Sequence, residues 1–218
     1  MSLVNIYKIL NYASACSILI PLACSAIKFR TLNHVLRVLF IYLVISSLTE
    51  FLNPIAARIS ISSYNALQNG FTFVEFLLVT TVYFFQLKNS ILGKVLISIA
   101  LLFSCLFLVI FIYGKNYLNA DSIVKPIEAA IMIVFAICYY FKVLKELMDK
   151  TAIVEDYYFT FINAAILIYF ASSFLIFLFA PYLATCPKRI FQFIWILNSI
   201  ANITYNSILT LGIWKQKA

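Results

Sequence analysis

Seven apolar segments, each long enough to cross a lipid bilayer, constrain this chain more than any other feature of its sequence. A helix needs about 20 apolar residues to span the hydrocarbon core. The segments cover approximately residues 9–29, 35–55, 66–87, 95–113, 123–143, 158–178 and 190–214. Inside a bilayer the backbone polar groups of an open chain are satisfied only within helices. We therefore expect an all-α integral membrane bundle of seven transmembrane helices, forming one domain over residues 1–218.

The composition excludes a soluble domain and a nucleic-acid partner. The chain is 64% hydrophobic and 11% charged, whereas an average soluble protein is about 25% charged. Its net charge of +8 comes from basic residues in the short connections between apolar segments. Such residues are typical signals of membrane topology. The expected environment is the lipid bilayer of a cell membrane, and we identify it with the bacterial inner membrane.

The distribution of Lys and Arg predicts the orientation of the bundle. Counting alternate sides of the seven segments places ten basic residues on one side: Lys28, Arg30, Arg37, Lys88, Lys94, Lys142, Lys145, Lys150, Lys215 and Lys217. The other side carries six: Lys8, Arg58, Lys115, Lys125, Lys188 and Arg189. Because cytoplasmic loops are richer in Lys and Arg, we expect the N-terminus outside and the C-terminus in the cytoplasm.

Three acids inside the apolar segments are the strongest candidates for function. Glu50, Glu75 and Glu128 lie roughly 7 to 14 Å below the predicted outer surface, at a rise of 1.5 Å per residue. An intramembrane acid is costly and is a functional hypothesis by default. The shared depth predicts an outward-facing pocket for a ligand or ion, and we add Asn198, near the middle of the membrane, to it.

A structural role for these acids stays open beside the functional one. Lys125 precedes Glu128 by three residues, so the two side chains can pair along one helix face. Glu50 and Glu75 have no cation near them in sequence. They are expected to be protonated, to pair across helices, or to bind a cation or cationic ligand.

A second polar set is predicted in the inner half of the membrane. Asn198, Asn202 and Asn206 are four residues apart and so share one helix face, and Asn163 lies in the preceding segment. Amides both donate and accept hydrogen bonds. We therefore interpret Asn163, Asn202 and Asn206 as an interhelical polar network.

Missing residues exclude most enzyme and cofactor classes. The last segment has no lysine near its middle, so it offers no attachment point for a retinal Schiff base. The single histidine, His34, cannot build an intramembrane metal site. We expect no enzyme, metal or cofactor. One alternative remains open, in which Glu50 and Glu75 serve as acid and base of a lipid-modifying enzyme.

Local signals predict the irregular parts of the helices. Pro21 lies inside the first segment and should free the carbonyl of Ser17, producing a kink. Pro54 is expected to break the second helix at its outer end. Glu146 and Lys150 have the spacing of a helix surface pair, so the fifth helix should continue beyond residue 143 into the cytoplasm.

Four stretches give the chain a family resemblance. They are FINAAILIYFASSFLIFLF (161–179), WILNSIANITYNSILTLGIW (195–214), FVEFLL (73–78) and PIEAAIMIVFAICYYFKVL (126–144). With them the chain resembles uncharacterised seven-helix bacterial membrane proteins that are often encoded beside sensor histidine kinases. The resemblance implies a sensor or accessory subunit that signals to a separate kinase. The matching polar positions are Glu75, Glu128, Asn163, Asn202 and Asn206.

Two functions are consistent with these observations. In the first, a receptor-like bundle binds a ligand or ion in the outer acidic pocket and signals to a separate partner, a sensor histidine kinase or another membrane protein. In the second, the chain is a small SWEET-like solute transporter, in which two three-helix repeats flank a linker helix and the mid-membrane amides bind a solute. Superposable halves would favour the transporter.

Overall fold

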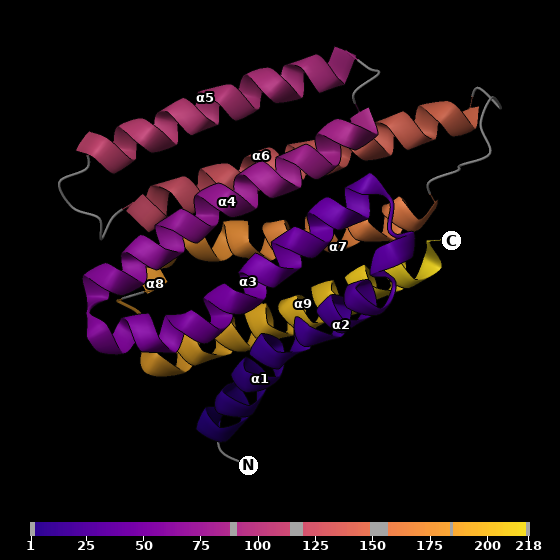
Figure 1. Ribbon diagram of the computed structural model, residues 1–218. Coiled ribbons are helices and arrows are strands. Elements are labelled where there is room, and N and C mark those ends of the chain that lie inside the picture. Colours follow the sequence, from indigo (N-terminus) through magenta and orange to yellow (C-terminus); the bar gives the residue numbers. More distant parts are fainter. Residues whose placement is uncertain (1–2, 88–90, 114–119, 149–156, 184, 217–218) are drawn as a thin grey trace.

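The long helices of this protein run side by side along most of their length (Figure 1). The structure, a computed structural model, describes residues 3–87, 91–113, 120–148, 157–183 and 185–216. In chain order its elements are α1 (Leu3–Ser17), α2 (Leu19–Ile27), η1 (Phe29–Thr31), α3 (His34–Ile59), α4 (Ile61–Leu87), α5 (Ile91–Tyr113), α6 (Ala120–Met148), α7 (Tyr157–Leu178), α8 (Ala180–Leu183) and α9 (Lys188–Lys215). All regular elements among these residues are helical, which confirms the all-α part of the predicted fold class.

Six helical segments of the described chain are long and apolar enough to cross a membrane, with α1 and α2 counting as one. The sixth of them is α7, and α9 does not join the set because amides and hydroxyls interrupt its apolar sequence. Large apolar side chains lie on the outer surface as well as in the core: Leu102 is 71% exposed, whereas Glu75 and Asn163 are fully buried. The chain is therefore a multi-pass helical membrane protein. A seventh crossing by α9 stays a prediction, although its 28 residues extend about 42 Å.

The long helices other than α5 form a closed ring of six segments, with α1 and α2 again counted as one, and α5 lies outside this ring. Neighbouring contacts run from α1 and α2 to α3, then to α4, α6, α7 and α9, which returns to α1 and α2. Helix α5 packs against α4 and α6 and forms the outer edge of the bundle in Figure 1. Its exposed Leu101 and Leu102 suit contact with lipid.

The predicted kink at Pro21 is confirmed as a break between two helices. Helix α1 ends at Ser17 and α2 begins at Leu19. Proline has no backbone N–H, so it cannot donate to the carbonyl of Ser17 four residues earlier. In Figure 1, α1 diverges from the line of α2.

Helices α3 and α4 are longer than their apolar segments, which corrects the prediction at Pro54. Helix α3 continues through Pro54 to Ile59, and α4 begins only one residue beyond Ser60. The hydroxyl of Ser60 accepts a hydrogen bond from the backbone N–H of Ser63 at 3.0 Å and so caps α4. The proline is tolerated because α3 packs along α4, where Gln68 donates to Asn53 at 2.7 Å.

Basic side chains gather at the opposite end of the bundle from Ser60. The ammonium of Lys28 donates to the carbonyl of Trp214 at 2.7 Å, and that of Lys142 donates to the carbonyl of Gln86 at 2.8 Å. Helix α6 continues to Met148, which confirms its predicted extension. Glu146 pairs with Lys142 at 3.6 Å. The predicted partner of Glu146, Lys150, lies outside the described residues, as do Lys88, Lys115 and Lys217.

Aromatic side chains fill the interior between the two ends. Tyr83 of α4 makes edge-to-face contacts with Phe135 of α6 and Phe159 of α7, with ring centroids 5.9 and 6.1 Å apart. Tyr139 contacts the same Phe159 ring at 4.8 Å. Such pairs contribute about 0.5–1.5 kcal/mol each beyond the area they bury. They hold α4, α6 and α7 together on the basic side of the acids discussed below.

Candidate functional site

A polar cavity of about 400 Å³ lies in the half of the bundle that contains the α3–α4 turn. It is not enclosed, and α1, α3, α4, α6, α7 and α9 all contribute to its wall. The charged and amide side chains that line it are Asn11, Glu50, Asn53, Gln68, Lys125, Asn198 and Asn202. Aromatic rings complete the wall, among them Tyr64, Phe71, Tyr169 and Trp195. A concave site with a few convergent polar groups among aromatic ones is typical of small-molecule binding.

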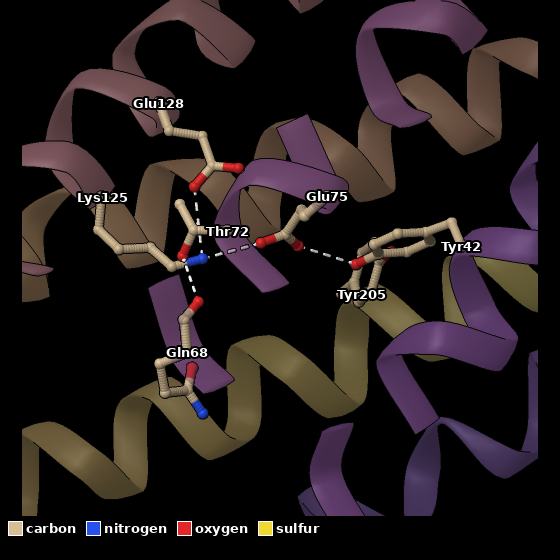
Figure 2. Close-up of polar contacts among 7 residues, drawn as sticks. All are labelled: Tyr42, Gln68, Thr72, Glu75, Lys125, Glu128 and Tyr205. Carbon is tan, nitrogen blue, oxygen red and sulfur yellow. Dashed lines mark hydrogen bonds and ion pairs between the residues drawn. The ribbon is translucent and has the colours of Figure 1, made fainter. Parts of the chain in front are cut away.

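A buried ion cluster, formed by Glu75, Lys125 and Glu128, adjoins this cavity. The ammonium of Lys125 lies 2.9 Å from Oε2 of Glu75 and 3.3 Å from Oε2 of Glu128. Figure 2 shows the lysine reaching from α6 toward the acid on α4. Both acids are fully buried, while Lys125 also lines the cavity. The pairing of Lys125 with Glu128 that was predicted from their spacing is present, and the pairing across helices with Glu75 joins α4 to α6.

Glu75 is also hydrogen bonded on its other side. The hydroxyl of Tyr42 donates to Oε1 of Glu75 at 3.0 Å, and the hydroxyl of Tyr205 lies 3.4 Å from that of Tyr42 (Figure 2). These contacts connect α3, α4 and α9. Glu75 is therefore held by three other helices, through an ammonium and a chain of phenols. Glu128 is less well satisfied, because neither of its carboxylate oxygens has a hydrogen-bond partner in the described chain.

A narrow recess of about 50 Å³ shares part of its wall with the cavity. Glu50, Phe71 and Tyr169 line both spaces, and Tyr42 and Tyr205 line the recess alone. Toward the basic end, beyond Tyr42 and Asn206 in their helices, α3 and α9 place buried apolar side chains such as Leu39 and Leu209.

The four residues predicted to bind a ligand occupy two different environments. Glu50 and Asn198 line the cavity, and Glu50 is exposed. Within the described chain, Glu50 has no ion pair or hydrogen bond, so its carboxylate is free for a ligand. Glu75 and Glu128 do not line the cavity but flank Lys125 beside it. The structure thus brings Glu75 and Glu128 to one lysine, and Glu50 lines the same cavity as that lysine.

The predicted polar network is divided in the same way. Asn163 is fully buried, where it accepts a hydrogen bond from Tyr83 at 2.7 Å and donates to the carbonyl of Ala136 at 3.1 Å. The amide nitrogen of Asn206 donates to Ser17 of α1 at 2.7 Å. Both amides therefore join separate helices. Asn202 instead lines the cavity and the recess, and its amide has no partner in the described chain.

The Tyr83–Asn163 hydrogen bond gives a direct test of this network. We expect Tyr83→Phe to lower the free energy of unfolding by about 1 kcal/mol, because it leaves a buried amide oxygen without a donor. Tyr140→Phe on α6 is the matched control, since the described chain gives its hydroxyl no hydrogen-bond partner. The measurement is unfolding by SDS titration in mixed micelles. Equal stabilities of the two variants would show that the hydrogen bond from Tyr83 to Asn163 does not stabilise the bundle.

Sequence reasoning missed the central position of Lys125 and the tyrosines around it. The spacing of Lys125 and Glu128 was visible, but no local signal connects Lys125 to Glu75, which is 50 residues away. Tyr42, Tyr169 and Tyr205 lie in apolar segments where a tyrosine is unremarkable in sequence. Trp195 was also missed, although its indole Nε1 is buried without an acceptor in the described chain.

No group of His, Cys, Asp and Glu that could hold a metal ion occurs among the residues that the structure describes. Comparisons with protein-family models, with curated proteins and with solved structures gave no match to this chain. The geometry of the cavity and of the ion cluster therefore carries the functional argument.

Proposed function

We propose that this protein is a receptor-like membrane sensor or accessory subunit that binds a small polar ligand in the cavity and signals to a separate partner. The observation that carries the proposal is Glu50, an acid with no partner in the described chain that lines an open cavity of about 400 Å³. Retaining an unpaired acid within an apolar helix costs stability. Binding is the function that such a group would serve.

The proposed orientation has the N-terminus and the cavity outside and α9 as a seventh crossing. Support comes from the gathering of Lys28, Lys142 and Lys215 at the opposite end, which matches the basic face of a cytoplasmic side. The cavity would then receive ligands from outside the cell membrane. The partner, a sensor histidine kinase or another membrane protein, would contact the basic end.

The ion cluster supplies a route from the cavity to the rest of the bundle. Lys125 lines the cavity and holds Glu75, which Tyr42 connects to α3. A ligand that moves Lys125 changes contacts of α4 and α6 together. Helix α6 then continues to Met148 at the basic end. We propose that a shift of α6, α7 and α9 reports occupancy, because a ligand moves a packing equilibrium only through different contacts in its two states.

Thermal unfolding of purified protein tests whether the cavity binds a ligand. The panel comprises amines, sugars, carboxylates and inorganic cations. We expect at least one solute to raise the melting temperature of the wild type, since binding to the folded state alone stabilises by about 2.7 kcal/mol at a hundredfold excess over Kd. Glu50→Gln should lose that shift, because it removes the carboxylate of the cavity that has no partner in the described chain.

Glu146→Gln is the matched control, since Glu146 is an acid of α6 at the basic end, paired with Lys142. It should respond to the solute as the wild type does. The proposal fails if no solute shifts the wild type, or if Glu50→Gln keeps the full shift.

A second candidate, the small solute transporter, is favoured by the ring of six segments. Three of them precede α5 in sequence and three follow it, and α5 alone lies outside. This is the arrangement expected of two three-helix repeats joined by a linker helix. Uptake of the stabilising solute into proteoliposomes tests it. Uptake abolished by Glu50→Gln would favour transport, and binding without uptake would favour the receptor.

A further inference from the structure

The chemistry of the recess identifies the class of ligand, on the premise that the cavity binds one as proposed above. Only Glu50 and Lys125 are charged among the described residues that line the cavity. Lys125 is already flanked by Glu75 and Glu128, so one lysine faces two acids before Glu50 is counted. An ionised Glu50 carboxylate would therefore add a negative charge that Lys125 does not balance. A cationic group would balance it.

The hydrogen bonds around the recess leave an unsatisfied acceptor. The hydroxyl of Ser17 donates to the carbonyl of Ser14 at 2.6 Å, so its oxygen is the acceptor for Asn206 at 2.7 Å. This arrangement fixes the amide nitrogen of Asn206 as the donor. Its Oδ1 is buried with no donor in the described chain, and Asn206, which is 4% exposed, lines the recess. A group that carries N–H donors would satisfy this oxygen.

The tyrosine hydroxyls nearest to Glu75 are already engaged. Tyr42 donates to Glu75, and Tyr205 lies within reach of Tyr42. Their rings line the recess beside Glu50, together with that of Tyr169, whose centroid lies 5.0 Å from that of Tyr205 in a tilted arrangement. Aromatic faces attract cations by about 0.5–2 kcal/mol. The hydroxyl of Tyr169 can donate or accept, so it does not oppose a cation.

We infer that the recess binds the ammonium head of a small primary or secondary amine, with Glu50 as the counter-ion and Asn206 as an acceptor. The volume of the recess, about 50 Å³, fits a group of a few heavy atoms, because a space of roughly 10–15 Å³ by the same measure holds one water. The wider cavity takes the rest of the ligand. There the unpartnered N–H of Trp195 suits an acceptor such as a hydroxyl.

Trp195 makes the inference directly measurable. The chain has two tryptophans, Trp195 and Trp214, and only Trp195 lines the cavity. In the Trp214→Phe variant, tryptophan fluorescence therefore comes from Trp195 in the cavity alone. Purified protein in phosphate buffer, free of amine buffers, is titrated with ethanolamine, with choline as the analogue without N–H groups, and with ethylene glycol as the neutral analogue. We expect saturable change with ethanolamine, and at least tenfold weaker responses with the other two.

Glu50→Gln in the same background should weaken ethanolamine binding at least tenfold, and Glu50→Asp should retain part of it. Should Glu50→Gln fail to fold, the ratio of the Kd values of ethanolamine and choline, measured in Trp214→Phe, still tests the inference. Choline binding as tightly as ethanolamine would overturn the inference. So would binding of a neutral or anionic solute alone, but that result would leave the proposed binding function intact. Thermal shifts absent for the whole solute panel would overturn both.

A lipid headgroup offers the same chemistry as a soluble amine. Mixed micelles that contain phosphatidylethanolamine or phosphatidylcholine separate the two sources. A preference for phosphatidylethanolamine that depends on Glu50 supports an amine site fed by lipid, and response to soluble ethanolamine alone supports one fed from water. Either result supports the amine recess, whereas a preference for phosphatidylcholine contradicts it.

Discussion

Lys125→Met should be among the most destabilising single substitutions in the described part of this protein, with an expected loss of about 3–5 kcal/mol in the free energy of unfolding. The ammonium of Lys125 lies 2.9 Å from Glu75 and 3.3 Å from Glu128, and both acids are fully buried. Removing it leaves two acids to share one apolar region without a cation. SDS titration in mixed micelles measures the loss.

Two further variants separate the ion cluster from a general need for lysine. Lys142→Met removes a more exposed lysine of the same helix, paired with Glu146 at 3.6 Å, and should cost within about 1 kcal/mol. Combining Lys125→Met with Glu75→Gln and Glu128→Gln removes all three charges and should recover most of the lost stability. If Lys125→Met alone is as stable as the wild type, the acids do not carry a charge that needs Lys125.

Gly212→Ala should also destabilise the bundle, by about 1–3 kcal/mol, because α9 approaches α7 too closely for a side chain. A Cβ at this position would lie 2.7 Å from Cγ1 of Ile162 and 3.2 Å from the carbonyl oxygen of Tyr158. Small residues permit this kind of approach between membrane helices. Gly212→Val should cost more. The same SDS titration measures both variants.

Gly70→Ala in α4 is the matched control for Gly212, because a Cβ there meets nothing within 4 Å. It should be neutral or stabilise by up to about 1 kcal/mol through better helix propensity. Equal effects at the two glycines would show that the close approach of α9 to α7 does not limit stability. A larger loss of stability at Gly212 would support the close approach of α9 to α7 at this residue.

Several local features of the fold could be predicted because their causes are local. Pro21 lacks the donor that Ser17 needs, so the break between α1 and α2 follows from one residue. The three-residue spacing of Lys125 and Glu128 places them on one helix face, and they do pair at 3.3 Å. The course of α3 through Pro54 could not be predicted, because it depends on packing against α4, where Gln68 donates to Asn53 beside the proline.

The candidate site was predicted only in part, for a reason that the amides make clear. Asn202 and Asn206 are one helical turn apart and looked equivalent in sequence. Asn206 donates to Ser17 of α1, whereas Asn202 faces the cavity. The difference depends on where α1 ends relative to α9. No residue near either amide in sequence encodes that relation.

The sequence by itself determined that the chain is a helical membrane protein, that one side of it carries more basic residues than the other, and that acids lie within its apolar helices. These properties depend on the solvent and on helix periodicity, which act on each segment separately. Only the tertiary structure decided that Glu50 lines an open cavity while Glu75 contacts Lys125. The rotation and register of each helix are set by packing against helices distant in sequence, so the role of each acid follows from its neighbours.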